Sequence, residues 1–91
     1  MIKKFEDLGV WKEARELCNT VHKLISSPPF SNDYALVNQI NRSSGSIMDN
    51  IAEGFGRRSY RERIQFYYIS HGSLVELKNQ LLIVKDIKYI S

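Results

Sequence analysis

Apolar residues of this 91-residue chain recur at steps of three and four, and two short breaks divide this pattern into three segments. Such spacing places apolar side chains on one side of an α-helix, so it restricts the chain to packed helices. In the first segment the stripe consists of Val10, Trp11, Ala14, Leu17, Cys18, Val21, Leu24 and Ile25. It predicts a helix from about Leu8 to Ser26, with Asp7 as the N-cap.

The two breaks predict where the other helices begin and end. Ser26-Ser27-Pro28-Pro29 ends the first helix, because each proline disfavours helical geometry at the residue before it. A second helix is expected from Ser31 or Asn32 to Gly54, followed by a turn at Gly54-Phe55-Gly56. Ser59 and Glu62 have the spacing of a capping box, which starts a third helix that runs to about Asp86. The second stripe is Leu36, Val37, Ile40, Ser44, Ile47 and Ile51.

The third helix carries apolar residues on two sides. One side has Phe66, Ile69, Ser73, Leu77, Leu81 and Val84, and the other has Ile64, Tyr67, Tyr68, His71, Val75 and Leu82. Three antiparallel helices bury one of these sides, so the other requires a further helix, another subunit or a ligand. No segment alternates with a period of two and no linker is evident. The sequence therefore predicts one all-α domain over residues 1–91, an antiparallel up-down helical bundle.

The cysteine count, the length of the apolar runs and the charge restrict the classes of function that the chain can have. A single cysteine, Cys18, forms no intrachain disulfide, and no apolar run reaches the length of a signal or a membrane span, so we expect a cytoplasmic protein with no membrane partner. The net charge of +3 is mild, but four of six arginines lie between positions 57 and 63. This local basic patch matters more than the total charge.

Several blocks resemble a known family: Phe5-Glu6-Asp7-Leu8, Val10-Trp11, Gln39-Ile40-Asn41-Arg42, Ser46-Ile47, Asn50-Ile51-Ala52-Glu53-Gly54, Gly56-Arg57 and Gly72-Ser73-Leu74-Val75-Glu76-Leu77. Their order and spacing resemble the four-helix-bundle proteins encoded within intervening sequences of bacterial 23S ribosomal RNA genes. The resemblance implies homopentameric rings, no enzymatic activity, and a relation to accessory proteins of diversity-generating retroelements, which bind reverse transcriptase and nucleic acid. The chain has Asn41-Arg42-Ser43-Ser44 where the family usually has Arg-Arg-Ala-Ala. It stops at Tyr89-Ile90-Ser91, where the family turns into a fourth helix, so we expect three long helices with the fourth missing or truncated.

A polar stripe lies beside the apolar one on the second helix: Gln39, Ser43, Ser46, Asn50, Glu53 and Arg57. It is either a solvated face or a buried or interfacial polar network that sets the register of a partner helix. The second interpretation, favoured by the family motif, predicts an oligomer interface or structural polar network. Its members are Gln39, Ser46, Asn50 and Glu53 together with Tyr67, Tyr68, His71, Val75 and Leu82 of the third helix.

The basic patch predicts nucleic-acid binding. Guanidinium groups match phosphate oxygens, and a tyrosine beside them offers a stacking surface for a base. The expected binding residues are Arg42, Arg57, Arg58, Tyr60, Arg61 and Arg63. Loop solvation and an acidic protein partner are the alternatives for this patch.

Nothing in the sequence indicates a catalytic centre. Tyr67, Tyr68 and His71 have no carboxylate or nucleophile at a convergent spacing, and two distant histidines and one cysteine make no metal cluster. We therefore expect no enzyme activity, metal or cofactor. The sequence favours a homo-oligomeric protein that binds RNA, DNA or a reverse-transcriptase-like partner; the alternative is a purely protein-binding scaffold.

Overall fold

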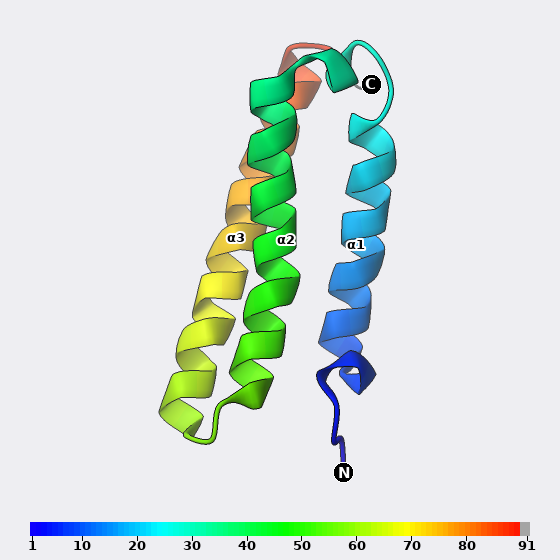
Figure 1. The fold of residues 1–91 in the computed structure, drawn as a ribbon. Coiled ribbons are helices and arrows are strands. Elements are labelled where there is room, and N and C mark those ends of the chain that lie inside the picture. Colours follow the sequence, from blue (N-terminus) through cyan, green and yellow to red (C-terminus); the bar gives the residue numbers. More distant parts are fainter. Residues whose placement is uncertain (90–91) are drawn as a thin grey trace.

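The computed structural model describes residues 1–89 and contains three long helices in this part of the chain: α1 (Gly9–Ile25), α2 (Tyr34–Gly56) and α3 (Tyr60–Asp86). Two 3-10 turns, Phe5–Asp7 and Phe30–Asn32, precede α1 and α2. α1 and α3 run in one direction and α2 runs in the other (Figure 1). The predicted all-α, up-down bundle is confirmed.

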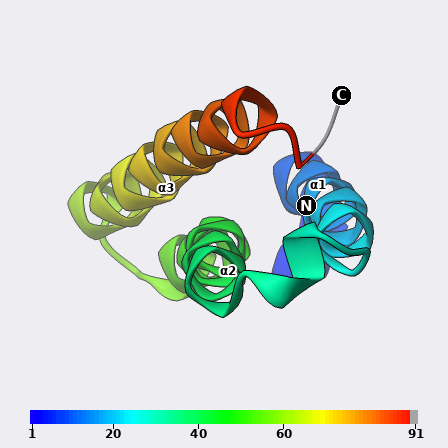
Figure 2. The same cartoon turned by 90° about the horizontal axis from the view of Figure 1, so that it is seen from above.

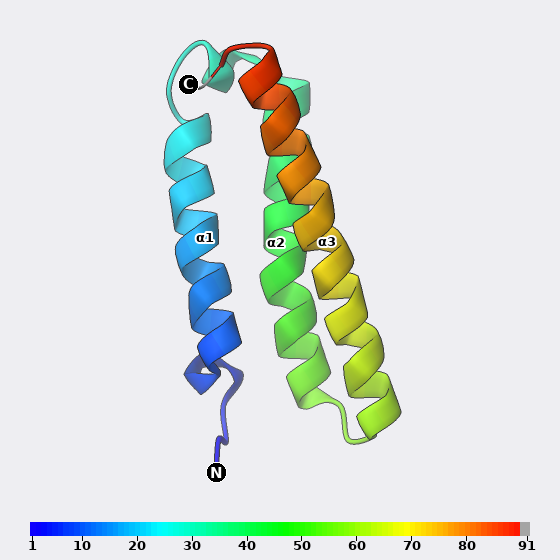
Figure 3. The ribbon, with the colours of Figure 1, turned by 180° about the vertical axis from the view of Figure 1, so that it is seen from behind.

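α2 is the central helix of the bundle. Seen along the helices, α1 and α3 lie on either side of it (Figure 2), and the view from behind shows the same order (Figure 3). α2 packs against both neighbours, and in the described chain α1 and α3 make no close backbone contact with each other. The buried core consists of Ala14, Val21, Ile25, Phe30, Ile40, Ile47, Ile51, Leu77 and Val84.

The starts of α1 and α2 differ from the prediction. Asp7 does not cap α1, because it belongs to the turn Phe5–Asp7 and α1 begins after Leu8 without a side-chain cap. Ser31 and Asn32 do not cap α2 either, since both lie in the turn that follows Pro29. Asp33 caps α2 instead, and its Oδ1 accepts a hydrogen bond of 3.2 Å from the Leu36 amide.

The turn predicted at Gly54 is also displaced. α2 continues to Gly56, and no glycine of the described residues has a positive φ. Gly54 is buried against α3: a Cβ there would lie 2.7 Å from Cε1 of Tyr67 and 3.2 Å from the Arg63 carbonyl oxygen. The glycine therefore serves close helix packing rather than a turn.

The predicted N-cap of α3 is confirmed, because the Ser59 hydroxyl accepts a hydrogen bond of 3.1 Å from the Glu62 amide. At the other end, Lys88 has a φ of 65° and the Tyr89 amide donates to the Val84 carbonyl over 3.1 Å, which is the pattern of a Schellman motif.

Tyr89 ties the end of α3 to the connection between α1 and α2. Its hydroxyl donates to Oδ2 of Asp33 over 3.2 Å, and its ring lies 5.6 Å from the Phe30 ring. This hydrogen bond to a carboxylate raises the pKa of the Tyr89 phenol. The same aspartate thus caps α2 and holds the chain after α3.

Candidate functional site

Most of the predicted binding arginines gather at the turn between α2 and α3. Arg57 is the C-cap of α2, Arg58 lies in the turn, and Arg61 and Arg63 belong to the first turns of α3. Tyr60 lies among them and is 78% exposed. This arginine turn stands at the end of the bundle opposite the end of α3 (Figure 1).

Arg42 does not belong to the arginine turn. It is fifteen residues before Arg57 on the same helix, which corresponds to about 22 Å along the axis. Its exposed side chain lies on α2 beside Asn38 and Asn41. Arg42 is close to the other arginines in the sequence, but it is not close to them in the structure.

Two of the four arginines hold the turn together. Arg57 makes an ion pair of 3.0 Å with Glu53, and its guanidinium carbon lies 4.7 Å from the centre of the Phe66 ring. Arg63 Nε donates to the Arg57 carbonyl over 2.6 Å. These contacts connect the last turn of α2 to the start of α3.

Arg58 and Arg61 differ from this pair. Both are exposed, and within residues 1–89 their side chains make no hydrogen bond or ion pair. They are the arginines of the turn that are available to an anion without breaking a contact of the fold. The carboxylates of Glu53 and Glu62 lie in the same region and reduce the positive charge, so the turn has a moderate excess of cations.

The polar stripe of α2 faces α3 in its middle part. The Ser43 hydroxyl donates to Oε1 of Gln80 over 2.6 Å, and both side chains are buried. One helical turn further, the Ser73 hydroxyl donates to Oγ of Ser46 over 2.8 Å, and Asn50 Nδ2 donates to the same oxygen over 2.9 Å. We call this row of contacts the polar seam.

Ser70 extends the polar seam, and its hydroxyl donates to the Ile47 carbonyl over 2.8 Å. The sequence analysis missed Ser70 and Gln80. Their spacing with buried Ser73, Leu77 and Val84, in steps of three and four, was the available signal. Polar residues within an apolar stripe indicate a helix face that meets polar partners.

The ends of the predicted stripe are exposed. Gln39 is exposed on α2. Among the described residues the Glu53 carboxylate pairs only with Arg57, and 57% of the Glu53 side chain is accessible. Their assignment to an interface between subunits stays a prediction.

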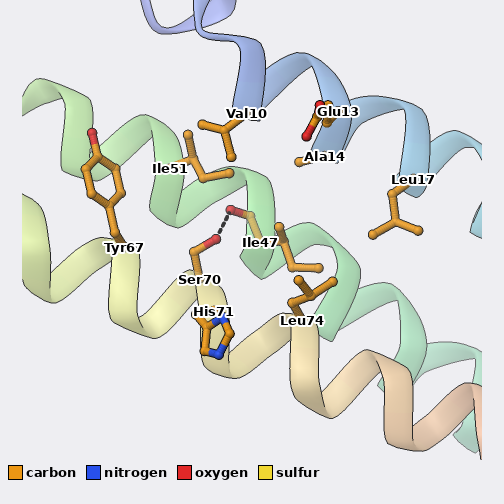
Figure 4. A pocket seen from close by; sticks show the side chains of 10 residues that line it. All are labelled: Val10, Glu13, Ala14, Leu17, Ile47, Ile51, Tyr67, Ser70, His71 and Leu74. Carbon is orange, nitrogen blue, oxygen red and sulfur yellow. Dashed lines mark hydrogen bonds between the residues drawn. The ribbon is translucent and has the colours of Figure 1, made fainter.

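The second apolar side of α3 is uncovered in the single chain. Tyr68 is 72% exposed, Val75 55% and Leu82 53%. With Ile64 they form what we call the α3 outer face. Tyr67 and His71 lie at its edge and line a hollow between α1 and α3, together with Val10, Glu13 and Ala14 of α1 (Figure 4). The interface proposed from the sequence thus consists of an outward part and a part that borders this hollow.

Glu13 is a carboxylate that the sequence analysis did not place near Tyr67 and His71, because it comes from another helix. No hydrogen bond joins it to either residue in the described structure.

Within residues 1–89 no three metal-binding side chains are grouped, and none of these helices is long and apolar enough to cross a membrane. The thiol of Cys18 donates to the Ser44 carbonyl over 3.1 Å, and burial raises its pKa.

The arrangement defines a class: an up-down bundle of long helices with a polar seam between two of them, an arginine-rich turn and an uncovered apolar face. The sequence comparison identifies the family within this class. The model of the 23S rRNA-intervening sequence protein family matches residues 6–91, and the chain belongs to that family. It is a family of small helical proteins and not a known enzyme family. No curated protein and no solved structure matches the chain.

Proposed function

We propose that this chain is a non-enzymatic, homo-oligomeric protein that binds the phosphate backbone of RNA or DNA through the arginine turn. The observation that carries this proposal is the placement of exposed Arg58, Arg61 and Tyr60 at one turn, at the end of the α2 and α3 pair. Guanidinium groups bind phosphate oxygens in a fork geometry, and an exposed tyrosine ring stacks on unpaired bases. Such contacts give salt-sensitive binding with little sequence preference.

The contacts within the turn support different roles for its arginines. Arg58 and Arg61 would make the primary phosphate contacts, while Arg57 and Arg63 hold the backbone that presents them. Two or three contacts from one chain are too few for tight binding. Repetition of the turn in an oligomer multiplies the contacts and raises the avidity.

The uncovered α3 outer face supports self-association. It exposes Tyr68, Val75 and Leu82, which lie in a row along one side of α3, and large apolar surfaces of this kind mark interaction sites. The family resemblance favours a pentamer, and its relation to retroelement accessory proteins adds a reverse-transcriptase-like protein as a possible partner. Sedimentation at tens of micromolar tests this part, and a strictly monomeric mass would contradict it.

The test of nucleic-acid binding compares two double variants of equal charge. Arg58→Gln/Arg61→Gln removes the exposed cations of the turn, and Lys12→Gln/Lys23→Gln removes two exposed cations from α1. Affinity for a labelled single-stranded RNA is measured from low to moderate salt. The first variant should bind more weakly, and the slope of log affinity against log salt concentration should fall in magnitude by roughly 0.7 for each lost contact, while the second variant should resemble the parent.

Binding that is equally weak in both variants, or absent in the parent at low salt, contradicts the proposal. The alternative function is then a protein-binding scaffold without nucleic acid, which the exposed α3 outer face favours on its own.

A further inference from the structure

The start of α1 carries an aromatic cluster that the fold leaves partly exposed. Trp11, the third residue of α1, packs against the core but keeps part of its surface accessible. The Phe5 ring meets it edge-on, with the ring centres 5.5 Å apart. The guanidinium carbon of Arg15 lies 5.8 Å from the centre of the Trp11 ring. The cluster therefore combines a partly exposed indole with a cation above it.

Trp11 and Arg15 line an open pocket of about 840 Å³ on the surface of α1, which we call the α1 pocket. Asn19 also lines it, and its amide offers both a donor and an acceptor. Formal charges cancel among the charged residues of the pocket, which are Glu6, Lys12, Arg15 and Glu16. A ligand of this pocket is therefore held mainly by stacking and hydrogen bonds, and the net charge contributes little.

The contact between Arg15 and Trp11 is suited to exchange. Arg15 is exposed, and within residues 1–89 its side chain makes no hydrogen bond or ion pair. A guanidinium over an exposed ring is held more weakly than a nucleobase stacked on tryptophan. A base that takes the accessible ring surface frees the guanidinium, which then pairs with a phosphate of the same strand. These two side chains thus have the chemistry to hold one unpaired nucleotide.

The α1 pocket lies at the same end of the bundle as the arginine turn. α1 starts beside the end of α2 (Figure 1), and the turn Phe5–Asp7 packs against both helices. Because α2 lies between α1 and α3, a strand that leaves the arginine turn toward α1 passes the end of α2, where exposed Gly56 has no side chain. Axes of packed helices are about 8 to 10 Å apart, so a few nucleotides cover this path.

We infer that the α1 pocket binds one unpaired base of a nucleic-acid strand whose phosphates are held by the arginine turn. The base stacks on Trp11, the Asn19 amide contacts the edge of the base, and Arg15 binds the adjacent phosphate. Such a site rests on the proposed function of the arginine turn and adds the class of its ligand. The ligand is a single strand, because the stacked and paired bases of a duplex offer no free face.

The emission of Trp11 reports on the α1 pocket without any substitution, since it is the only tryptophan of the chain. Titration with an oligothymidine of about 12 nucleotides should quench this emission, because a stacked base quenches an indole. An abasic strand of the same length carries the same phosphates. It should bind the arginine turn, as the anisotropy of a labelled end shows, but leave the emission of Trp11 unchanged. A DNA duplex should do the same.

Three variants separate stacking from charge. Trp11→Leu keeps an apolar side chain against the core but removes the ring, and it should bind oligothymidine about tenfold more weakly with the same salt slope. Trp11→Phe should restore most of this affinity. Tyr34→Leu is the matched control, because Tyr34 is a 76% exposed aromatic residue at the opposite end of α2, and its loss should leave binding unchanged.

Unchanged emission at saturating oligothymidine, equal quenching by the abasic strand, or parental affinity of Trp11→Leu overturns the inference. The arginine turn keeps its proposed function in each of these cases, provided that the abasic strand binds the parent and binds Arg58→Gln/Arg61→Gln more weakly. An emission that changes on dilution of the protein but not with oligonucleotide assigns Trp11 to a contact between subunits and also overturns the inference. The emission titration uses the parent chain, so it holds even where Trp11→Leu is unstable.

Discussion

Replacement of Gly54 by alanine tests the close approach of α2 and α3. Gly54 lies within α2, where alanine normally stabilises a helix by about 1 kcal/mol relative to glycine. Here the added methyl group would lie 2.7 and 3.0 Å from two carbons of the Tyr67 ring and 3.2 Å from the Arg63 carbonyl oxygen. The ring can rotate away, but the carbonyl belongs to the backbone of α3, so α3 must shift away from α2 by a few tenths of an ångström.

The size of the effect follows from these two opposing contributions. Overpacking of a tight contact typically costs about 1 to 3 kcal/mol, which outweighs the gain in helix propensity. Gly45→Ala and Gly72→Ala are matched controls, because a Cβ at either position has no neighbour within 4 Å and the propensity gain remains. Gly54→Ala should therefore melt roughly 5 to 20 °C below the Gly45→Ala variant.

Thermal unfolding followed by circular dichroism measures this difference, and chemical denaturation gives the free energies. If Gly54→Ala raises the melting temperature as much as the two controls do, Tyr67 and α3 adjust without cost. The interpretation of Gly54 as a helix-packing residue would then be wrong.

Three further predictions concern the polar seam and two side chains near it. Ser43→Ala leaves buried Gln80 without its donor and should reduce the free energy of unfolding by about 1 to 3 kcal/mol, whereas Ser43→Ala combined with Gln80→Leu should recover part of the loss. Glu53→Ala breaks only an exposed pair with Arg57 and should change unfolding of a monomer by less than about 0.5 kcal/mol; a larger loss, accompanied by a smaller sedimentation mass, would place Glu53 in a subunit interface. Since burial raises the pKa of Cys18, iodoacetamide should modify it more slowly at neutral pH than a free thiol, and the rate should still rise at pH values where a free thiol has reached its plateau.

The number and order of the helices followed from the sequence because each helix carries an apolar stripe of the right period. The cap of α3 was equally clear, since Ser59 and Glu62 have a local spacing that needs no tertiary contact. The ends that were predicted incorrectly depend on packing. Buried Phe30 holds the turn after Pro29, so Asp33 rather than Ser31 reaches the start of α2. Gly54 has the composition of a turn, and only its position against Tyr67 reveals why a glycine is needed.

The candidate site was harder to predict for the same reason. Four arginines within seven residues are visible in the sequence, but the sequence does not separate Arg57 and Arg63, which hold the turn, from Arg58 and Arg61, which are exposed. Arg42 was included because it is near in sequence, although a straight helix carries it far from the others. The hollow lined by Tyr67 and His71 combines side chains from all three helices, so it has no local signature at all.

The two sides of α2 differ in chemistry, and this difference has a consequence for assembly. Toward α3, hydroxyl and amide groups such as those of Ser43, Gln80 and Ser73 are paired with specific partners, which gives this helix pair one register. Toward α1, the contact is formed by apolar residues such as Ala14, Val21 and Ile25, which specify a register less strictly. In an assembly of this chain the α2 and α3 pair therefore keeps its register, and with it the position of the arginine turn at the end of the pair.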